Sequence, residues 1–216
     1  MKKLFVMIAV VGVNLSSAWA QLGGFSKPNL PSGGATPEEI DKFLGDSVVA
    51  DTLVQKSSMQ LLKAVVSKQK YEKIDAEMKA AMAIQDPRER EAKVNVVQAE
   101  VRTELMKVNF QEVNAQLKAK ADTKKNQAIR HGLWNLALGG LKDVELVNSG
   151  KKLVSGPPRP EVAGRISEVK QAIEKLASQG EGVTKILGSA KVLMSTVGLE
   201  SLPKSATEPA KFAERE

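Results

Sequence analysis

The sequence predicts an all-α fold, a helical bundle that carries one long antiparallel helical hairpin with its tip near Asp86 and Pro87. Two long runs, residues 46–86 and 88–131, contain neither glycine nor proline, and apolar residues recur in both at helical spacing. The step between them has the pattern of a helix start, with a capping aspartate, a proline at the first helical position and Glu89 at the third. No stretch alternates in the manner of a β-strand.

Both runs are polar beside Asp86 and more apolar farther away. Before it, the large apolar residues thin to Ile74, Met78, Met82 and Ile84, and after it they begin at Val94. A narrow apolar stripe suits one partner helix rather than a core. We therefore expect two helices of about 30 residues, each roughly 45 Å long, to pair as a hairpin that projects from a better-packed body. The alternative is a kinked continuous helix lying across the bundle.

The chain begins with the pattern of a secretory signal peptide, residues 1–20, which places the mature start at Gln21. Two lysines, a short apolar core and the cleavage motif Ala18-Trp19-Ala20 make up this pattern. An uncleaved anchor is the alternative. Together with the absence of cysteine, which precludes disulfides, the signal predicts a bacterial periplasmic or secreted protein.

After the signal we expect a flexible leader over residues 21–35, a single all-helical domain over residues 36–203 and a disordered tail over residues 204–216. Glycine and proline near residue 156 separate the last part of the domain. There, one apolar stripe runs from Val162 to Leu176, and the sequence Ser178-Gln179-Gly180 predicts its end. A further helix is expected up to Leu202 and Pro203.

The chain carries 32 basic and 25 acidic residues, a formal net charge of +7. Removing Lys2 and Lys3 with the signal leaves +5, since 30 − 25 = 5. A modest positive charge favours anionic surfaces or acidic partners without selecting one. After the signal no apolar run is long enough to predict a transmembrane helix.

We expect no catalytic residues, no cofactor and no metal site. His131 is the only histidine, so the paired imidazoles of common metal sites cannot form, and we expect it to be a basic residue at a helix junction. Ser167 and Lys170 match a serine–lysine spacing without its companion motifs. Residues 148–152 resemble the end of a phosphate loop but lack its first glycine. Carboxylates near the hairpin tip are interleaved with lysines and arginines, so ion pairs explain them best.

A basic cluster is the most distinctive polar feature of the sequence. It consists of Lys118, Lys120, Lys124, Lys125 and Arg130. These residues are the predicted contact for an anionic partner such as a membrane surface, and a solvated turn is the alternative. Nucleic acid is not expected as a partner, because no aromatic residues for base stacking accompany the cluster.

Small residues accompany two later apolar stripes, over residues 133–147 and 183–197. They allow either close helix packing or a cavity for an apolar guest. The function expected is that of a non-enzymatic periplasmic protein, chaperone-like or coiled-coil in character, that binds a protein client or a partner subunit and that can form homo-oligomers. The alternative is a periplasmic carrier or membrane-surface protein for an apolar or lipid-like ligand. In architecture this is similar to helical periplasmic holdase chaperones, although the chain lacks their strand-rich base.

Overall fold

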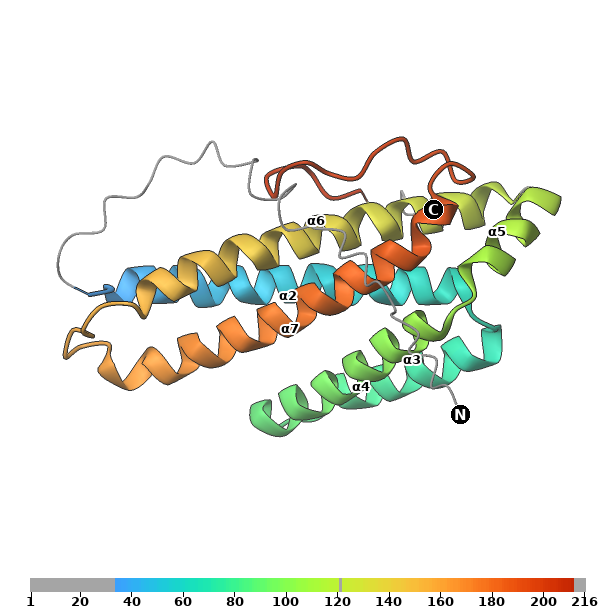
Figure 1. Ribbon diagram of the computed structural model, residues 1–216. Helices are drawn as coiled ribbons and strands as arrows, with labels where there is room; N and C mark the ends of the chain where they lie inside the picture. The colour runs from blue at the N-terminus through green and yellow to red at the C-terminus, as the bar shows by residue number, and fades with distance from the viewer. Residues whose placement is uncertain (1–33, 121, 212–216) are drawn as a thin grey trace, which may run out of the picture. The chain divides into compact units, whose positions relative to one another are not determined.

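The computed structural model describes residues 34–120 and 122–211, and these contain helices and no strand. The all-α prediction is therefore confirmed. The signal peptide and the leader up to residue 33 lie outside the described residues. Six α-helices follow one another: α2 (Pro37–Val65), α3 (Lys68–Met82), α4 (Pro87–Lys107), α5 (Phe110–Ala119), α6 (Thr123–Leu153) and α7 (Ile166–Ala190), with the short 3₁₀ helices η1 (Ala163–Arg165) and η2 (Lys191–Leu193) on either side of α7 (Figure 1).

The helix start predicted at Asp86 is present, and α2 begins in the same way at Thr36. Thr36 forms a complete capping box: its hydroxyl accepts from the Glu39 amide at 3.2 Å, and its own amide donates to the Glu39 carboxylate at 2.8 Å. The Asp86 carboxylate accepts from the amide of Glu89 at 2.8 Å. Each cap is followed by a proline at the start of its helix, where no amide donor is needed.

The antiparallel hairpin is confirmed, with α3 and α4 side by side and the turn at Asp86 exposed (Figure 1). Ile74 and Met78 on α3 belong to the same hydrophobic cluster as Val97 and Val101 on α4. The hairpin is not a free arm, however. It lies on the body, because α4 also contacts α2 and α7.

The expected helices of about 30 residues are wrong, because each long run is broken within its length. The breaks occur at Ser67, Asn109 and Asp122, and each of these side chains caps the helix that follows it. The cap oxygens accept amide hydrogen bonds of 3.4, 3.2 and 2.9 Å respectively. Glycine and proline are therefore not needed to end a helix here, because a capping side chain satisfies the free amides of the next one.

The predicted end of a helix at Ser178-Gln179-Gly180 is also wrong, since α7 continues through it to Ala190. The buried residues of α7 keep three- and four-residue steps across Gly180, from Leu176 through Gln179 to Val183. Burial of this continuous face outweighs the cost of about 1 kcal/mol for a glycine inside a helix.

The glycines of α6 serve close helix packing. A Cβ at Gly132 would lie 3.3 Å from Leu61 of α2, and one at Gly139 would lie 2.4 Å from Val54 of α2. A Cβ at Gly140 would lie 2.9 Å from the side chain of Val183 on α7. Residues 133–147, considered above as a wall for an apolar guest, therefore include glycines that pack directly against neighbouring helices.

The first part of the tail that we expected to be disordered makes specific contacts with α6. Residues 204–211 are held against α6: the Trp134 indole donates to the carbonyl of Pro209 at 3.1 Å, and Asn135 exchanges hydrogen bonds with the backbone of Lys211. The Lys211 ammonium also lies 3.3 Å from the centre of the Trp134 ring. Side chains distant in sequence supply these contacts, so local composition does not predict them. Residues 212–216 lie outside the described residues.

A prediction follows from the contact between α6 and α2. We expect Gly139→Ala to lower the free energy of unfolding by about 1–3 kcal/mol, because the added methyl group overlaps Val54 and forces the two helices apart. Gly45→Ala is the control: Gly45 lies within α2 with no atom near its Cβ position, and the substitution should stabilise by up to about 1 kcal/mol. Urea unfolding measures both. An equal response of the two variants would contradict the packing explanation.

Candidate functional site at the hairpin seam

The α3–α4 hairpin is joined to the rest of the chain through two short breaks. Val66 and Ser67 precede α3, and Val108 and Asn109 follow α4. The backbone is extended at both Val66 and Val108. All four residues line one groove of about 290 Å³, so the two breaks lie together. The two connections therefore lie side by side at one end of the hairpin.

We use the name seam for the contact of the hairpin with α2 and α7. Its centre is apolar. Met78, Val97 and Val101 of the hairpin are buried in one cluster with Val54 and Leu61 of α2. Burial of such side chains contributes about 1.5–3 kcal/mol each, so the hairpin is held mainly by this apolar centre.

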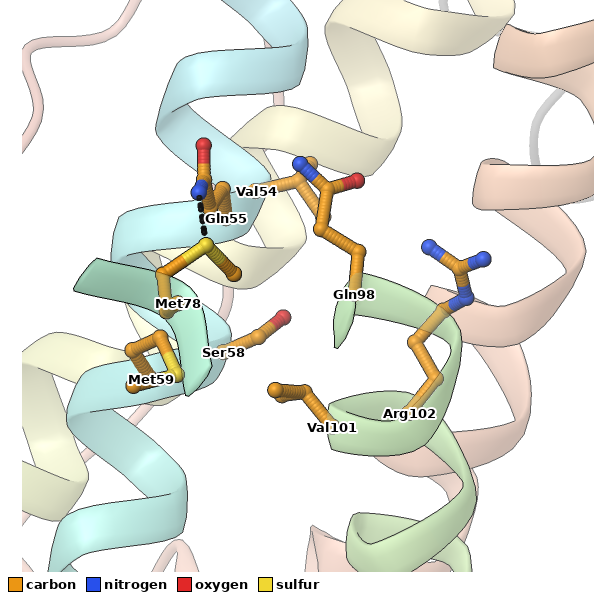
Figure 2. A pocket seen from close by; sticks show the side chains of 8 residues that line it. All are labelled: Val54, Gln55, Ser58, Met59, Met78, Gln98, Val101 and Arg102. Atoms are coloured by element: carbon orange, nitrogen blue, oxygen red, sulfur yellow. Dashed lines mark hydrogen bonds between the residues drawn. The ribbon is translucent and has the colours of Figure 1, made fainter. Parts of the chain in front are cut away.

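The seam also contains a small cavity, shown in Figure 2. The cavity measures about 10 Å³, which is close to the space needed by one water molecule. The residues around it come from α2, α3 and α4 and are Val54, Gln55, Ser58, Met59, Met78, Gln98, Val101 and Arg102. One hydrogen bond crosses it, from the Gln55 amide to the Met78 sulfur at 3.0 Å. A thioether is a weak acceptor, so this contact adds little stability.

Two polar side chains at the cavity are poorly matched to their surroundings. Ser58 is 3% exposed and Gln98 is 6% exposed, yet the Ser58 hydroxyl and the Gln98 amide nitrogen have no hydrogen-bond partner among the described residues. A buried polar group without a protein partner costs about 1–3 kcal/mol. The seam is therefore less stable than an apolar contact of the same size.

Charged side chains mark the edge of the seam. The Lys175 ammonium of α7 lies 3.0 Å from the Asp51 carboxylate of α2 and 3.9 Å from the Glu91 carboxylate of α4. Arg102 of α4 is partly buried, and burial lowers the pKa of its guanidinium, an effect that the charge of Asp51 opposes. One oxygen of Asp51 is buried without a partner among the described residues. The ionic contacts across this edge are few and partly exposed, so they hold the hairpin weakly.

A groove of about 450 Å³ opens at the same edge, between α2, α4 and α7. Each helix contributes one face, at three- and four-residue spacing. The lining residues are Leu44, Ser47, Val48 and Asp51 of α2, Glu91 and Asn95 of α4, and Glu168, Gln171, Ala172, Lys175 and Leu176 of α7. The groove is amphipathic, and it leads from the surface to the seam.

A buried carboxylate lies behind the seam. Asp143 of α6 is 1% exposed, and its oxygens accept from the amide of Gln179 on α7 at 3.1 and 3.3 Å. Burial raises the pKa of Asp143 to about 7. The Gln179 hydrogen bond lowers this pKa, and the nearby charge of Asp51 raises it.

The hydrophobic core is divided into two clusters near Asp143. Ala50 and Leu176 belong to one hydrophobic cluster, whereas Val54 and Val183, one turn or two farther along the same helices, belong to another.

The basic cluster predicted from the sequence lies around the connection between α5 and α6. Lys118 and Lys120 stand at the end of α5, and Lys124 and Lys125 stand in the first turn of α6. Arg130 lies farther along α6 and is partly buried. None of the five lines the cavity or the two grooves described above. Their role as a contact for an anionic partner stays a prediction.

The expectation that His131 marks a helix junction is wrong, because it lies inside α6. It is 9% exposed, and one ring nitrogen has no partner among the described residues. Burial, followed by the charges of Arg130 and Lys211, lowers the pKa of its imidazole. The ring is therefore a neutral part of the packing at neutral pH.

The motifs that we set aside in the sequence have ordinary positions. Ser167 and Lys170 are exposed on α7, and residues 148–152 are inside α6 rather than in a loop. Near the hairpin tip Asp75 pairs with Lys79 at 2.6 Å, as expected for ion pairs. Within residues 34–120 and 122–211 there is no group of three histidine, cysteine or carboxylate side chains placed to hold a metal ion.

None of the helices in the described part of the chain is both long and apolar enough to cross a membrane. Comparison of the chain with protein-family models, with curated protein sequences and with solved structures gives no match.

A substitution at the cavity tests whether the seam is imperfectly paired. We expect Ser58→Ala to raise the free energy of unfolding by about 1 kcal/mol, because it removes a buried hydroxyl that has no protein partner. Ser47→Ala is the matched control, since the buried Ser47 hydroxyl donates to the carbonyl of Phe43 at 2.7 Å. That variant should be neutral or destabilised by up to about 1 kcal/mol. Thermal unfolding of the two variants measures the difference, and destabilisation by Ser58→Ala would disprove this description of the cavity.

Proposed function

We propose that the protein is a non-enzymatic periplasmic binding protein that holds other proteins in a chaperone-like manner. In this proposal the α3–α4 hairpin swings on the hinge formed by residues 66–67 and 108–109. The movement uncovers the apolar centre of the seam, which then receives an apolar segment of a client protein. The hairpin closes again when the client leaves.

The observation that carries the proposal is the make-up of the seam. An apolar centre is combined with a cavity, an edge of weak ion pairs, and polar groups at Ser58 and Gln98 that have no partner within the described part of the chain. Elements with such contacts open at a lower free energy than the whole domain unfolds. The hinge at one end of the hairpin lets that opening occur without disturbing the packing of α2 on α6.

The side chains at the seam also suit a variable client. Met59 and Met78 line the cavity, and methionine adapts to partners of different shape because its side chain is unbranched and polarizable. The groove beside Asp51 and Lys175 gives a client segment a path from the seam to the surface. The single histidine, His131, is buried and has no carboxylate partner among the described residues, which favours binding over acid–base chemistry.

A cross-link between the hairpin and α2 tests the proposal, and the chain contains no cysteine that would interfere. The variant Gln55→Cys/Met78→Cys replaces two side chains in contact across the seam. Bridging the two thiols with a short bis-maleimide should abolish suppression of the aggregation of reduced α-lactalbumin, because the apolar centre can no longer be uncovered. Light scattering measures the aggregation with and without the bridge.

The matched control carries the same reagent within the hairpin. Lys70 and Glu104 form an ion pair between α3 and α4, so Lys70→Cys/Glu104→Cys can be bridged without tying the hairpin to α2. This bridged control should retain the suppression shown by the unmodified protein. Equal activity of the two bridged variants, or absence of suppression in the unmodified protein, would refute the proposed function.

A further inference from the structure

The surroundings of Asp143 suit a neutral acid rather than a carboxylate. Among the described residues, its hydrogen-bond partner is the amide of Gln179, itself 2% exposed, which donates to both carboxyl oxygens. Within residues 34–120 and 122–211 it forms no ion pair, and the nearby Lys175 pairs with Asp51 and Glu91. A buried carboxylate with a single neutral donor is costly to ionise.

The charged groups around Asp143 come from each helix packed near it. From α2, Asp51 faces it and disfavours a second negative charge. From α7, Lys175 is engaged by Asp51 and Glu91 instead. On α6 itself, Lys142 and Glu145 are its neighbours in sequence and lie toward the surface.

The hairpin covers this region through Arg102 of α4. The stem of Arg102 lies 3.0 Å from the Cβ position of Gly182 on α7, and the Cβ position of Gly180 lies 3.8 Å from Asp143. Arg102 thus touches the same turn of α7 that carries Gln179, and the charge of Asp51 acts on both Arg102 and Asp143. Lifting α4 would remove the Arg102 stem from this turn of α7.

We propose that Asp143 is a proton-operated latch for the hairpin: the protonated acid is accommodated while the hairpin is closed, and loss of the proton favours the open hairpin, in which water reaches the carboxylate. This inference rests on the proposed function, because it assigns the regulation of the same seam. It gives a client-holding protein a direct response to the pH of its surroundings.

The direction follows from proton linkage. The closed state binds the Asp143 proton with a pKa of about 7, and an aspartate in contact with water has a pKa of about 3.9. The closed state is thus favoured most below about pH 4, and this preference is lost as the pH rises towards 7. Between these values opening increases by up to tenfold per pH unit, and above about pH 7 it levels off.

The labelling rate of a cysteine placed under the hairpin tests the latch. Val101 is 2% exposed on the inner face of α4, and Val96 is 60% exposed on the same helix. Val101→Cys reacts with a maleimide only when the hairpin opens, whereas Val96→Cys reports the reactivity of an open thiol at each pH. The ratio of the two rates should rise by at least about tenfold between pH 5 and 7 and then remain constant.

The same ratio is measured in proteins that also carry Asp143→Asn, which keeps the shape of the side chain and removes the proton. There the ratio should not change with pH. A flat ratio in the parent protein, or an equal rise with Asp143→Asn, would overturn the latch. Carboxyl ¹³C NMR of the unsubstituted protein provides a check that does not depend on the folding of a variant. A midpoint near 7 is expected for Asp143, and a midpoint near 4 would overturn the latch while leaving the cross-linking result, and thus the proposed function, intact.

Discussion

The close approach of α6 to α2 is the contact on which the rest of the structure depends. Gly132 and Gly139 bring the backbone of α6 against Leu61 and Val54 of α2, so the two longest helices pack with little between them. Burial along α6 is nearly continuous from Ile129 to Gly139 as a result. With α7 packed on both helices, these three elements supply a stable body. The α3–α4 hairpin packs on this body. Two short breaks, at residues 66–67 and 108–109, join the hairpin to the rest of the chain.

The packing of α2 on α6 and the seam differ in their make-up and therefore in their stability. The packing of α2 on α6 is tight and apolar, whereas the seam tolerates Ser58, Gln98 and Arg102 in buried or partly buried positions. Polar groups of this kind lower the stability of the seam, although Val54 and Leu61 of α2 contribute to both contacts. A protein that must open locally and remain folded needs this difference in stability between its parts.

Local signals in the sequence predicted the helical class, the cap at Asp86 and the hairpin, since each depends on residues that are close in the chain. The break at Asn109 was missed because apolar spacing continues across it, whereas the thinning of apolar residues after Ser67 was interpreted as a narrower stripe of one helix. The seam was missed for a different reason: its cavity arises from three helices that meet only in the fold. A signal was nevertheless present, since Gln98 and Asp143 occupy positions of apolar stripes where a polar residue is unusual.

The position of Asp143 also explains why the core is divided. An apolar residue at this level would join the two hydrophobic clusters and bind α6, α7 and α2 into one rigid unit. A carboxylic acid hydrogen-bonded to Gln179 keeps the helices in contact, and in the proposed latch its proton sets the stability of that contact. Asp51 acts on Asp143 through its charge and pairs with Lys175, which also reaches Glu91 on the hairpin. These polar side chains therefore lead from the packed body to the edge of the seam, which is the route that the proposed latch requires.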